Sequence, residues 1–407
     1  MTRLGLILGL CGLWASACRG DAVSDDPADY NIDPSRPYVL EVKEPRFVVH
    51  SPTLPAKVGY EPSNNNVDIV FHEDRLFMAW RQGPTHFAGP DVKMQVVSSL
   101  NQGESWDWEA TIALGSDVRE PRLLSMNGRV WLYFFQGGDQ ATSFDPRHLW
   151  RIERRDLANW TAPERGGRDG EVPWDLKVRN GLAYLTSYAG NHYGTGDSAI
   201  EVYFQKSSNG VDWEPVNAAR PVSYLGGASE VAFEFDVDGS AWFLTRNEDG
   251  DATGFGSHLC YAPPDDPSDW RCPSQSDPER YDSPEMFRHG EDVFLLARRD
   301  VGGPYDLGRD DLDLTNQRRV YALEYWSRPK RTALYKIDKV ARKVVFVQDL
   351  PGTGDTAFAS VKRLGPHQFL VANYTSPLEL GDISWEEGQS SPRGTRIYLL
   401  ELEFRPD

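Results

Sequence analysis

Residues 98–108 read "SSLNQGESWDW" and follow the apolar run "VKMQVV" (92–97). Asn-Gln-Gly is typical of a turn, and a Trp directly after a turn needs an apolar site to fill. The same arrangement recurs at "RRDLANW" (154–160), "KSSNGVDW" (206–213) and "PPDDPSDW" (263–270), so that the four Trp are 54, 53 and 57 residues apart. A constant period with one Trp per repeat predicts a β-propeller in which each Trp packs between neighbouring sheets.

A second pattern indicates the number of blades. Six segments each contain a strand, a turn with Gly, Asn or Asp, and a strongly apolar strand; they are 66–81, 117–135, 172–188, 229–246, 282–299 and 355–374. The sequence therefore predicts an all-β fold over residues 45–407, a six-bladed β-propeller with four-stranded antiparallel blades. Five blades is the alternative, because the segment 300–354 is irregular.

The first residues are typical of an export signal. Arg3 precedes an apolar run from Leu4 to Trp14, which is too short to span a bilayer, and small residues then lead into Cys18. This pattern resembles a bacterial lipoprotein signal. We expect a signal peptide at 1–17, lipid on Cys18 and a polar tether at 18–44, which would make the protein a membrane-anchored lipoprotein of the bacterial cell envelope; plain secretion is the alternative.

The remaining cysteines and the overall charge limit the partners. Cys260 and Cys272 flank a Pro-rich turn, and in an exported chain such a pair predicts a disulfide. Two thiols without a nearby His make a poor zinc site, and we expect neither a metal nor a cofactor. A formal net charge of -18 argues against nucleic acid and leaves the N-terminal lipid as the only expected membrane contact.

The ends of the predicted inner strands should surround a central funnel. Each of the six segments starts near an acid: Asp68, Asp117, Asp175, Glu230, Asp282 and Asp355. The partner strands end at Arg81, Tyr188, Arg246, Arg298 or Arg299, and Tyr374. These residues are candidates for glycoside chemistry, which requires two carboxyl groups in different environments. The alternative is that the acids cap turns.

Glu230 and Arg246 lie 16 residues apart at opposite ends of one strand–turn–strand unit, and Asp282 and Arg298 repeat that spacing. With Arg81, these arginines form a set whose planar donors suit a carboxylate. The alternative is that each arginine pairs with an acid of a neighbouring blade.

Two of the turns, "SLNQGESW" (99–106) and "SSNGVDW" (207–213), resemble the Asp boxes (BNR repeats) of the sialidase-like superfamily. The resemblance covers residues 45–407. It implies that Arg81, Arg246 and Arg298 match the family's arginine triad, and that Glu230 matches the Glu that activates a Tyr nucleophile. The family's acid/base Asp has two possible counterparts here, Asp117 and Asp91.

This chain departs from the family where the nucleophilic Tyr is expected, because Phe358 stands there in "TAFAS". Tyr374, at the end of the partner strand, is the remaining Tyr candidate. Carboxyl groups alone can also hydrolyse a glycoside, which makes Asp117, Glu230 and Asp282 candidates. His86 and His192 lie in Gly-containing loops after strand ends, and we expect His86 to contact the substrate.

These observations predict an extracytoplasmic glycoside hydrolase acting on glycans, including anionic ones. Two alternatives remain at this point. One is a catalytically inactive propeller that binds glycan or protein. The other is a propeller hydrolase of neutral sugars in which the arginines are structural.

Overall fold

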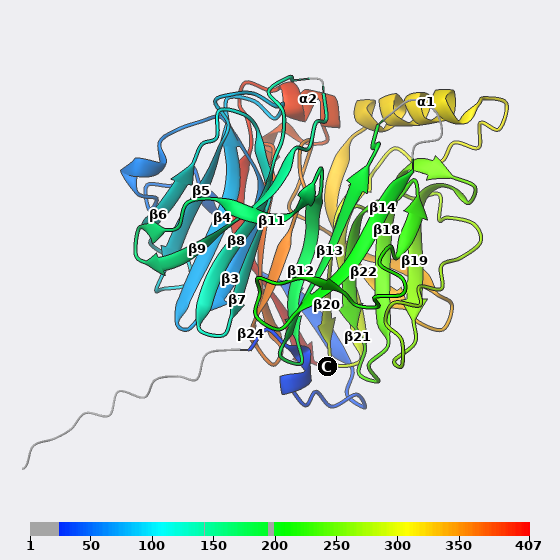
Figure 1. Cartoon of the computed structure of the whole chain (residues 1–407), viewed down its shortest axis with the longest axis horizontal. Coiled ribbons are helices and arrows are strands. Elements are labelled where there is room, and N and C mark those ends of the chain that lie inside the picture. Colours follow the sequence, from blue (N-terminus) through cyan, green and yellow to red (C-terminus); the bar gives the residue numbers. More distant parts are fainter. Residues whose placement is uncertain (1–23, 142, 194–198) are drawn as a thin grey trace, which may run out of the picture.

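The computed structural model describes residues 24–141, 143–193 and 199–407. These residues form six antiparallel sheets around a central axis, and the chain is a six-bladed β-propeller (Figure 1). This confirms the predicted fold and excludes five blades. The second strand of each blade is largely buried, because neighbouring blades cover both of its faces, and it contains an apolar run; β8 (Arg129–Gln136, "RVWLYFFQ") is the clearest example.

The first three blades follow one another along the chain. Blade 1 contains β3 (Ser63–His72), β4 (Arg75–Gly83), β5 (Lys93–Ser99) and β6 (Asp107–Ile112). Blade 2 contains β7 (Val118–Met126), β8, β9 (His148–Asp156) and β10 (Asn159–Trp160), with β11 (Glu164–Asp169) also paired to β9. Blade 3 contains β12 (Val172–Arg179), β13 (Leu182–Gly190), β14 (Ile200–Ser207) and β15 (Glu214–Pro215), with β16 (Tyr224–Gly226) also paired to β14.

The last three blades include both ends of the described chain. Blade 4 contains β17 (Ser229–Phe235), β18 (Ala241–Asp251) and β19 (Gly254–Ala262). Blade 5 contains β20 (Asp282–His289), β21 (Asp292–Asp300), β22 (Lys330–Asp338) and β23 (Lys343–Leu350). Blade 6 contains β24 (Ser360–Gly365), β25 (Gln368–Thr375) and β26 (Arg396–Pro406), to which β1 (Tyr38–Val42) and β2 (Arg46–Val49) both pair. The ring is therefore closed by strands from its two ends, and the propeller begins at Tyr38, within the range expected to form a tether.

Blade 4 differs from the predicted four strands. Only isolated pairs, Ser257 with Asp277 and Tyr261 with Arg271, stand at its outer edge in the described residues. The segment 263–278 is rich in proline, which cannot donate to a sheet ladder. The predicted disulfide between Cys260 and Cys272 is confirmed and ties this segment to β19.

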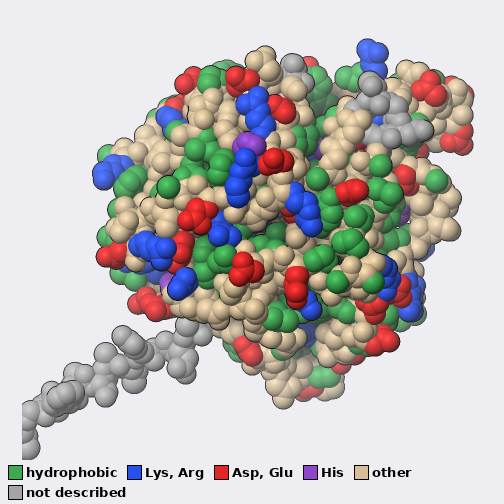
Figure 2. Space-filling view, in the orientation of Figure 1, with side chains coloured by type: hydrophobic (Ala, Val, Ile, Leu, Met, Phe, Trp, Pro, Cys, Tyr) green, Lys and Arg blue, Asp and Glu red, His purple; other side chains and the backbone are tan. Residues whose placement is uncertain are grey.

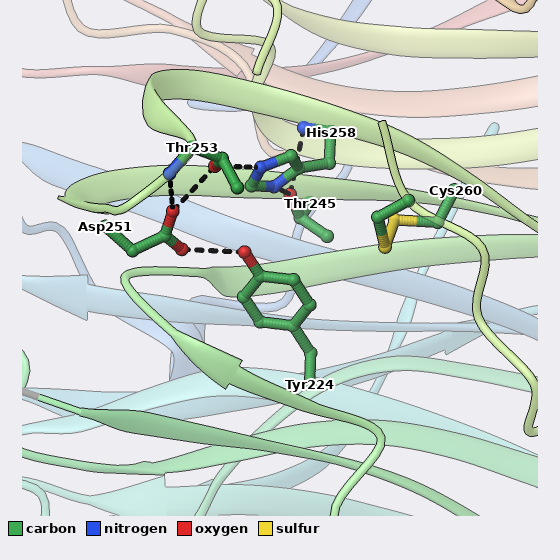
Figure 3. The surroundings of a disulfide bond; sticks show 7 residues. Tyr224, Thr245, Asp251, Thr253, His258 and Cys260 are labelled. Atoms are coloured by element: carbon green, nitrogen blue, oxygen red, sulfur yellow. Dashed lines mark hydrogen bonds between the residues drawn. A yellow bond between two sulfur atoms is a disulfide. The ribbon is translucent and has the colours of Figure 1, made fainter. Parts of the chain in front are cut away.

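A partly buried polar chain lies near the disulfide (Figure 3). Tyr224 donates a hydrogen bond of 2.6 Å to Asp251, and the other carboxylate oxygen of Asp251 accepts from the Thr253 hydroxyl, also at 2.6 Å. His258 lies between the hydroxyls of Thr253 and Thr245, at 2.6 and 3.1 Å. These bonds satisfy the buried polar groups and hold the β18–β19 hairpin.

Each recurring Trp contacts the preceding blade. Trp106 and a blade 6 side chain, Leu399, both lie against Gly103, whose φ of 83° and lack of a Cβ the turn requires. Trp213 donates to Tyr133 of blade 2 at 3.0 Å, and Trp270 stacks on Phe243 and contacts Phe204 of blade 3. Trp160 donates to Glu109 of blade 1 at 3.2 Å. The periodic Trp therefore joins the blades, as the sequence predicts.

The described residues contain two α-helices, α1 (Leu314–Ser327) and α2 (Trp385–Ser390), and three short 3₁₀ turns, η1 (Pro27–Asp29), η2 (Ala56–Val58) and η3 (Leu378–Leu380). Both α-helices lie at the upper end of the propeller in Figure 1. The first is in the segment 300–354, which looked irregular in the sequence. Acidic and basic side chains are interspersed on the face shown in Figure 2. Among the described residues, no helix has the length and apolarity needed to cross a membrane.

Candidate active site

A β-bulge interrupts the innermost strand of five blades near the upper end of the axis. The register shifts after Asn65, Arg119, Pro173, Ser229 and Asp282. A bulge inserts one residue without a partner and redirects its side chain. The inserted position is occupied by Asn66, Glu120, Trp174, Glu230 and Ser283, and four of these, all except Trp174, have positive φ. In blade 6, Ala357 has a positive φ just before Phe358 and β24.

These bulges surround a pocket of about 360 Å³. Asn66, Glu120, Glu230, Ser283 and Phe358 all line it. Helix α2 forms part of the wall through Trp385 and Gln389, which places the opening at the upper end of Figure 1. The pocket brings together six of the eight catalytic and substrate-binding residues expected from the sequence: Asp117, Glu230, Tyr374, Arg246, Arg298 and His86.

Glu120 was not a candidate in the sequence, yet it has the properties of a catalytic carboxyl group. Its only hydrogen bonds within the described residues come from the Asn66 amide, at 3.2 and 3.3 Å. Burial raises its pKa from 4.5 to about 7, although Arg122, Arg119 and Arg246 oppose the rise. A carboxyl group that changes charge near neutral pH in a pocket suits acid–base catalysis.

Glu230 lies on the equivalent bulge two blades further on. Its Oε1 is 2.6 Å from Nη1 of Arg246, and its Oε2 accepts from the backbone N–H of Ser283 at 3.1 Å. Burial raises the pKa of Glu230 well above the usual range. The Arg246 charge lowers this pKa, but the charges of Asp282, Glu120 and Glu248 raise it further. The predicted candidate Glu230 is therefore in the pocket, where burial raises its pKa and the Arg246 guanidinium opposes the rise.

Asp282 was also a catalytic candidate, but it is fully buried beneath the pocket. It accepts from Arg246, Arg280 and Tyr325, each at 3.1 Å, and it also pairs with Arg298. Burial raises its pKa, but the three arginines outweigh burial and hold the pKa well below the usual range. Its oxygens are occupied by these partners, so Asp282 acts as a counter-ion that fixes the arginines.

The predicted arginine triad does not converge on the pocket. Arg81 is 0% exposed, and its donors go to Asp117 and to the carbonyls of Thr85 and Phe87. The sequence predicts that Arg81 binds substrate. The structure places it behind the pocket wall, because the loop after its strand surrounds its guanidinium.

The other two arginines of the triad reach the pocket but use most of their donors on protein groups. Arg246 pairs with Glu230, Asp282, Ser229 and His192. Arg298 pairs with Asp282, the carbonyls of Thr356 and Ala357, and the Tyr374 hydroxyl.

Asp117 lines the pocket between two arginines. One oxygen accepts from Arg81 at 2.8 Å and the other pairs with Arg119. Burial raises the pKa of Asp117, but Arg119 and Arg81 outweigh it and leave the pKa below the usual range. Asp117 is therefore a poor proton donor. Arg119, which the sequence analysis missed, lines the pocket, and its Nη1 has no hydrogen-bond partner in the described chain.

Tyr374 reaches the pocket as expected for the alternative Tyr. Its hydroxyl donates to Asp355 at 3.0 Å, and burial together with the Asp355 charge raises its pKa well above the usual range. Asp355 also accepts from His86 at 2.7 Å and from the Trp385 indole at 3.1 Å. Tyr374 therefore keeps its proton, and His86 is held by a carboxylate at the pocket wall.

An aromatic pair encloses the Arg122 guanidinium, and one of its two rings, that of Phe358, lines the pocket. The Arg122 guanidinium lies 4.9 Å from the Trp174 ring and 4.6 Å from the Phe358 ring. Arg122 is 4% exposed, and within the described residues its buried Nε has no hydrogen-bond partner. Phe358, at the position where the sequence resemblance leads one to expect a Tyr, packs against this cation.

The remaining candidates lie elsewhere. Asp68 and Asp175 are buried further down the axis, where they accept from the backbone N–H groups of Leu123 and Phe233 in the next blade. Asp91 is exposed and does not line the pocket. His192 lines it, bonded to Asp249 and Arg246. Cys18 lies outside the described residues. Among the residues that are described, no three His, Cys, Asp or Glu side chains are grouped to hold a metal ion.

Comparison with solved structures supports the fold. A protein of unknown function from Dyadobacter fermentans matches with a TM-score of 0.55 at 13% identity, over 84% of this chain and 95% of that one. The endosialidase of phage phi92 matches with a TM-score of 0.52 at 10% identity, over 91% and 70%. The fold is that of a sialidase-like propeller.

An α-L-arabinofuranosidase from Fusarium graminearum, solved with an iminosugar inhibitor, matches with a TM-score of 0.53 at 10% identity, over 89% of this chain and 98% of that one. No protein-family model matches the sequence, and the comparison with curated proteins finds no match. Because all these identities are low, the likeness establishes the architecture, and the chemistry has to be argued from the pocket.

Proposed function

We propose that this protein is a glycoside hydrolase whose catalytic carboxyl groups are Glu120 and Glu230. The observation that carries the proposal is their placement. Two buried carboxyl groups with raised pKa occupy equivalent bulges of blades 2 and 4 and line one pocket. Glycoside hydrolysis requires such a pair, with one group protonated and the other ionised.

The environments of the two groups assign their roles. We assign Glu230 as the proton donor, because burial raises its pKa well above the usual range; in this role it gives its proton to the glycosidic oxygen as the bond breaks. Glu120, with a pKa of about 7, acts as the carboxylate that attacks the sugar or activates a water molecule. The anomeric form of the first product distinguishes these two routes, because direct attack retains the configuration and water attack inverts it.

The pocket favours a terminal sugar that is neutral. The pocket holds about 360 Å³ and is walled by residues of all six blades, so a chain end fits better than the middle of a chain. Arg81, Arg246 and Arg298 are mainly engaged by Asp117, Asp282, Glu230 and carbonyl groups. An anionic sugar, as expected from the sequence, would have to bind through Arg119, whose Nη1 has no partner among the residues described. We place the enzyme outside the cytoplasm because of the signal-like N-terminus and the Cys260–Cys272 disulfide.

The test is sugar release by purified residues 19–407 from neutral glycosides, uronides and sialosides. Glu120→Gln and Glu230→Gln should each lower kcat/KM by about 10² to 10⁴. Glu285→Gln is the matched control, because Glu285 is also buried with a pKa raised to about 7 but does not line the pocket. With an aryl leaving group that needs no protonation, Glu230→Gln should recover activity and Glu120→Gln should not.

The other outcomes have defined meanings. Release of only carboxylated sugars, abolished by Arg119→Met, would replace the neutral substrate by an anionic one. Full activity in both Gln variants would refute the carboxyl pair. Binding of a glycan without any hydrolysis would make the protein a receptor with an enzyme-like fold.

A further inference from the structure

The first described residues are bound across the end of the propeller opposite the pocket. Residues 24–42 lie at the lower end of Figure 1, whereas α2, which lines the pocket, lies at the upper end. The sequence predicts a polar tether over 18–44. The contacts of residues 24–30, together with strand β1, show instead a segment with a specific seat.

Asp25 occupies the centre of this seat. Its Oδ1 accepts from the backbone N–H of Arg363 at 3.0 Å, and its Oδ2 lies 3.6 Å from Nζ of Lys362 and 3.9 Å from Arg179. Lys362 is only 6% exposed, and Asp25 is the nearest of its anionic partners. A buried ammonium requires a counter-charge. The Asp25 carboxylate supplies this charge to Lys362 at the lower end of the axis.

Neighbouring residues of the segment bind three blades. Asp26 accepts from the backbone N–H of Asn180 in blade 3, and the Tyr30 ring lies 4.7 Å from the Arg363 guanidinium in blade 6. Ile32 lies against Gly290 of blade 5, and β1 then pairs with β26. A cavity of about 270 Å³ beside the axis is walled partly by Ser24, Asp25 and Asp26.

We propose that residues 24–42 fix the face opposite the pocket against the lipid surface to which Cys18 is anchored, so that the pocket opens away from the membrane. The proposal rests on lipid at Cys18, and it is independent of the hydrolase activity. Its structural basis is that the first described residues after Cys18 are bound to one end of the propeller.

Chain length limits the alternatives. Six residue steps separate Cys18 from the first seated residue, Ser24, and an extended chain spans at most about 3.5 Å per step, roughly 20 Å in all. Strand β3 has 10 residues from the pocket end to the lower end, and a strand of that length spans about 33 Å. While the segment stays seated, the chain is too short to turn the pocket towards the membrane.

The experiment uses the mature lipidated protein, which begins at Cys18 and lacks Cys11, in vesicles of phosphatidylethanolamine and phosphatidylglycerol that carry a headgroup energy acceptor. Donor labels are placed on Asp74→Cys, in the exposed β3–β4 turn at the lower end, or on Gln140→Cys, exposed beside the pocket. Cys260 and Cys272 are oxidised and an acylated Cys18 does not react, so each variant has one reactive thiol. Transfer should be several-fold stronger from position 74 than from position 140.

A second comparison tests the seat itself. Asp25→Ala combined with Asp26→Ala should reduce the difference between the two labels and expose residues 24–37 to protease. Asp29→Ala is the matched control, because Asp29 is exposed and its side chain has no contact with the propeller among the described residues. Equal transfer from both positions in the unmodified protein would overturn the proposal, and so would unchanged vesicle binding by Cys18→Ser.

Discussion

Replacing Glu120 by Gln should stabilise the protein and inactivate it. The pKa of Glu120 is raised from 4.5 to about 7. Between these pH values the folded protein retains a proton on Glu120 that the unfolded chain has released, so raising the pH favours unfolding. A rise of this size corresponds to about 3 kcal/mol of stability lost by pH 8. Gln carries no such charge and avoids the loss.

Local geometry accommodates the substitution. In the native pocket the Asn66 amide donates to Glu120, and its own Oδ1 is buried without a hydrogen-bond partner. A rotated Asn66 amide can therefore accept from the new Gln amide.

Urea unfolding followed by Trp fluorescence at several pH values measures the effect. The difference in unfolding free energy between Glu120→Gln and the unmodified protein should grow from near zero at pH 4 to about 3 kcal/mol at pH 8. Over the same range kcat/KM should be lower by about 10² to 10⁴. Glu285→Gln should show a stability gain of the same direction without loss of activity. A gain that does not depend on pH, or a variant that retains activity, would refute the reasoning.

Three further predictions concern Arg122, Tyr374 and the disulfide. Arg122→Met removes a cation that lowers the pKa of Glu120, so the acidic limb of the kcat/KM profile should move to higher pH. At acidic pH, kcat/KM should fall roughly tenfold for each pH unit by which the pKa of Glu120 rises. An acidic limb that does not move would contradict the role assigned to Glu120. Tyr374→Phe should keep activity within about tenfold, because a protonated Tyr bonded to Asp355 is not the nucleophile; a loss of about 10³ or more would restore the Tyr mechanism. Replacing Cys260 and Cys272 by Ser opens a loop with a sequence separation of 12 and should lower the unfolding free energy by about 3 kcal/mol in the same urea assay. A decrease below about 1 kcal/mol would show that the Pro-rich segment is held by other contacts.

The sequence alone was sufficient for the architecture, because the signals are local and repeated. Trp106, Trp160, Trp213 and Trp270 each follow a turn at a nearly constant period, and each packs on the preceding blade. The apolar second strands and the pair Cys260 and Cys272 are equally visible without a structure. These patterns can be recognised in the sequence because every repeat must bury the same surfaces.

The tertiary structure decided which side chains form the site. Side chains alternate along a strand, so one inserted residue changes which of them points to the axis. The bulge after Arg119 brings Glu120 into the pocket, while Asp117 is held between two arginines and Asp68 serves the next blade. Arg81 is taken up by a loop of its own blade. The position of a bulge, the partners of an arginine and the seat of Asp25 depend on contacts between distant segments, which no local pattern in the sequence records.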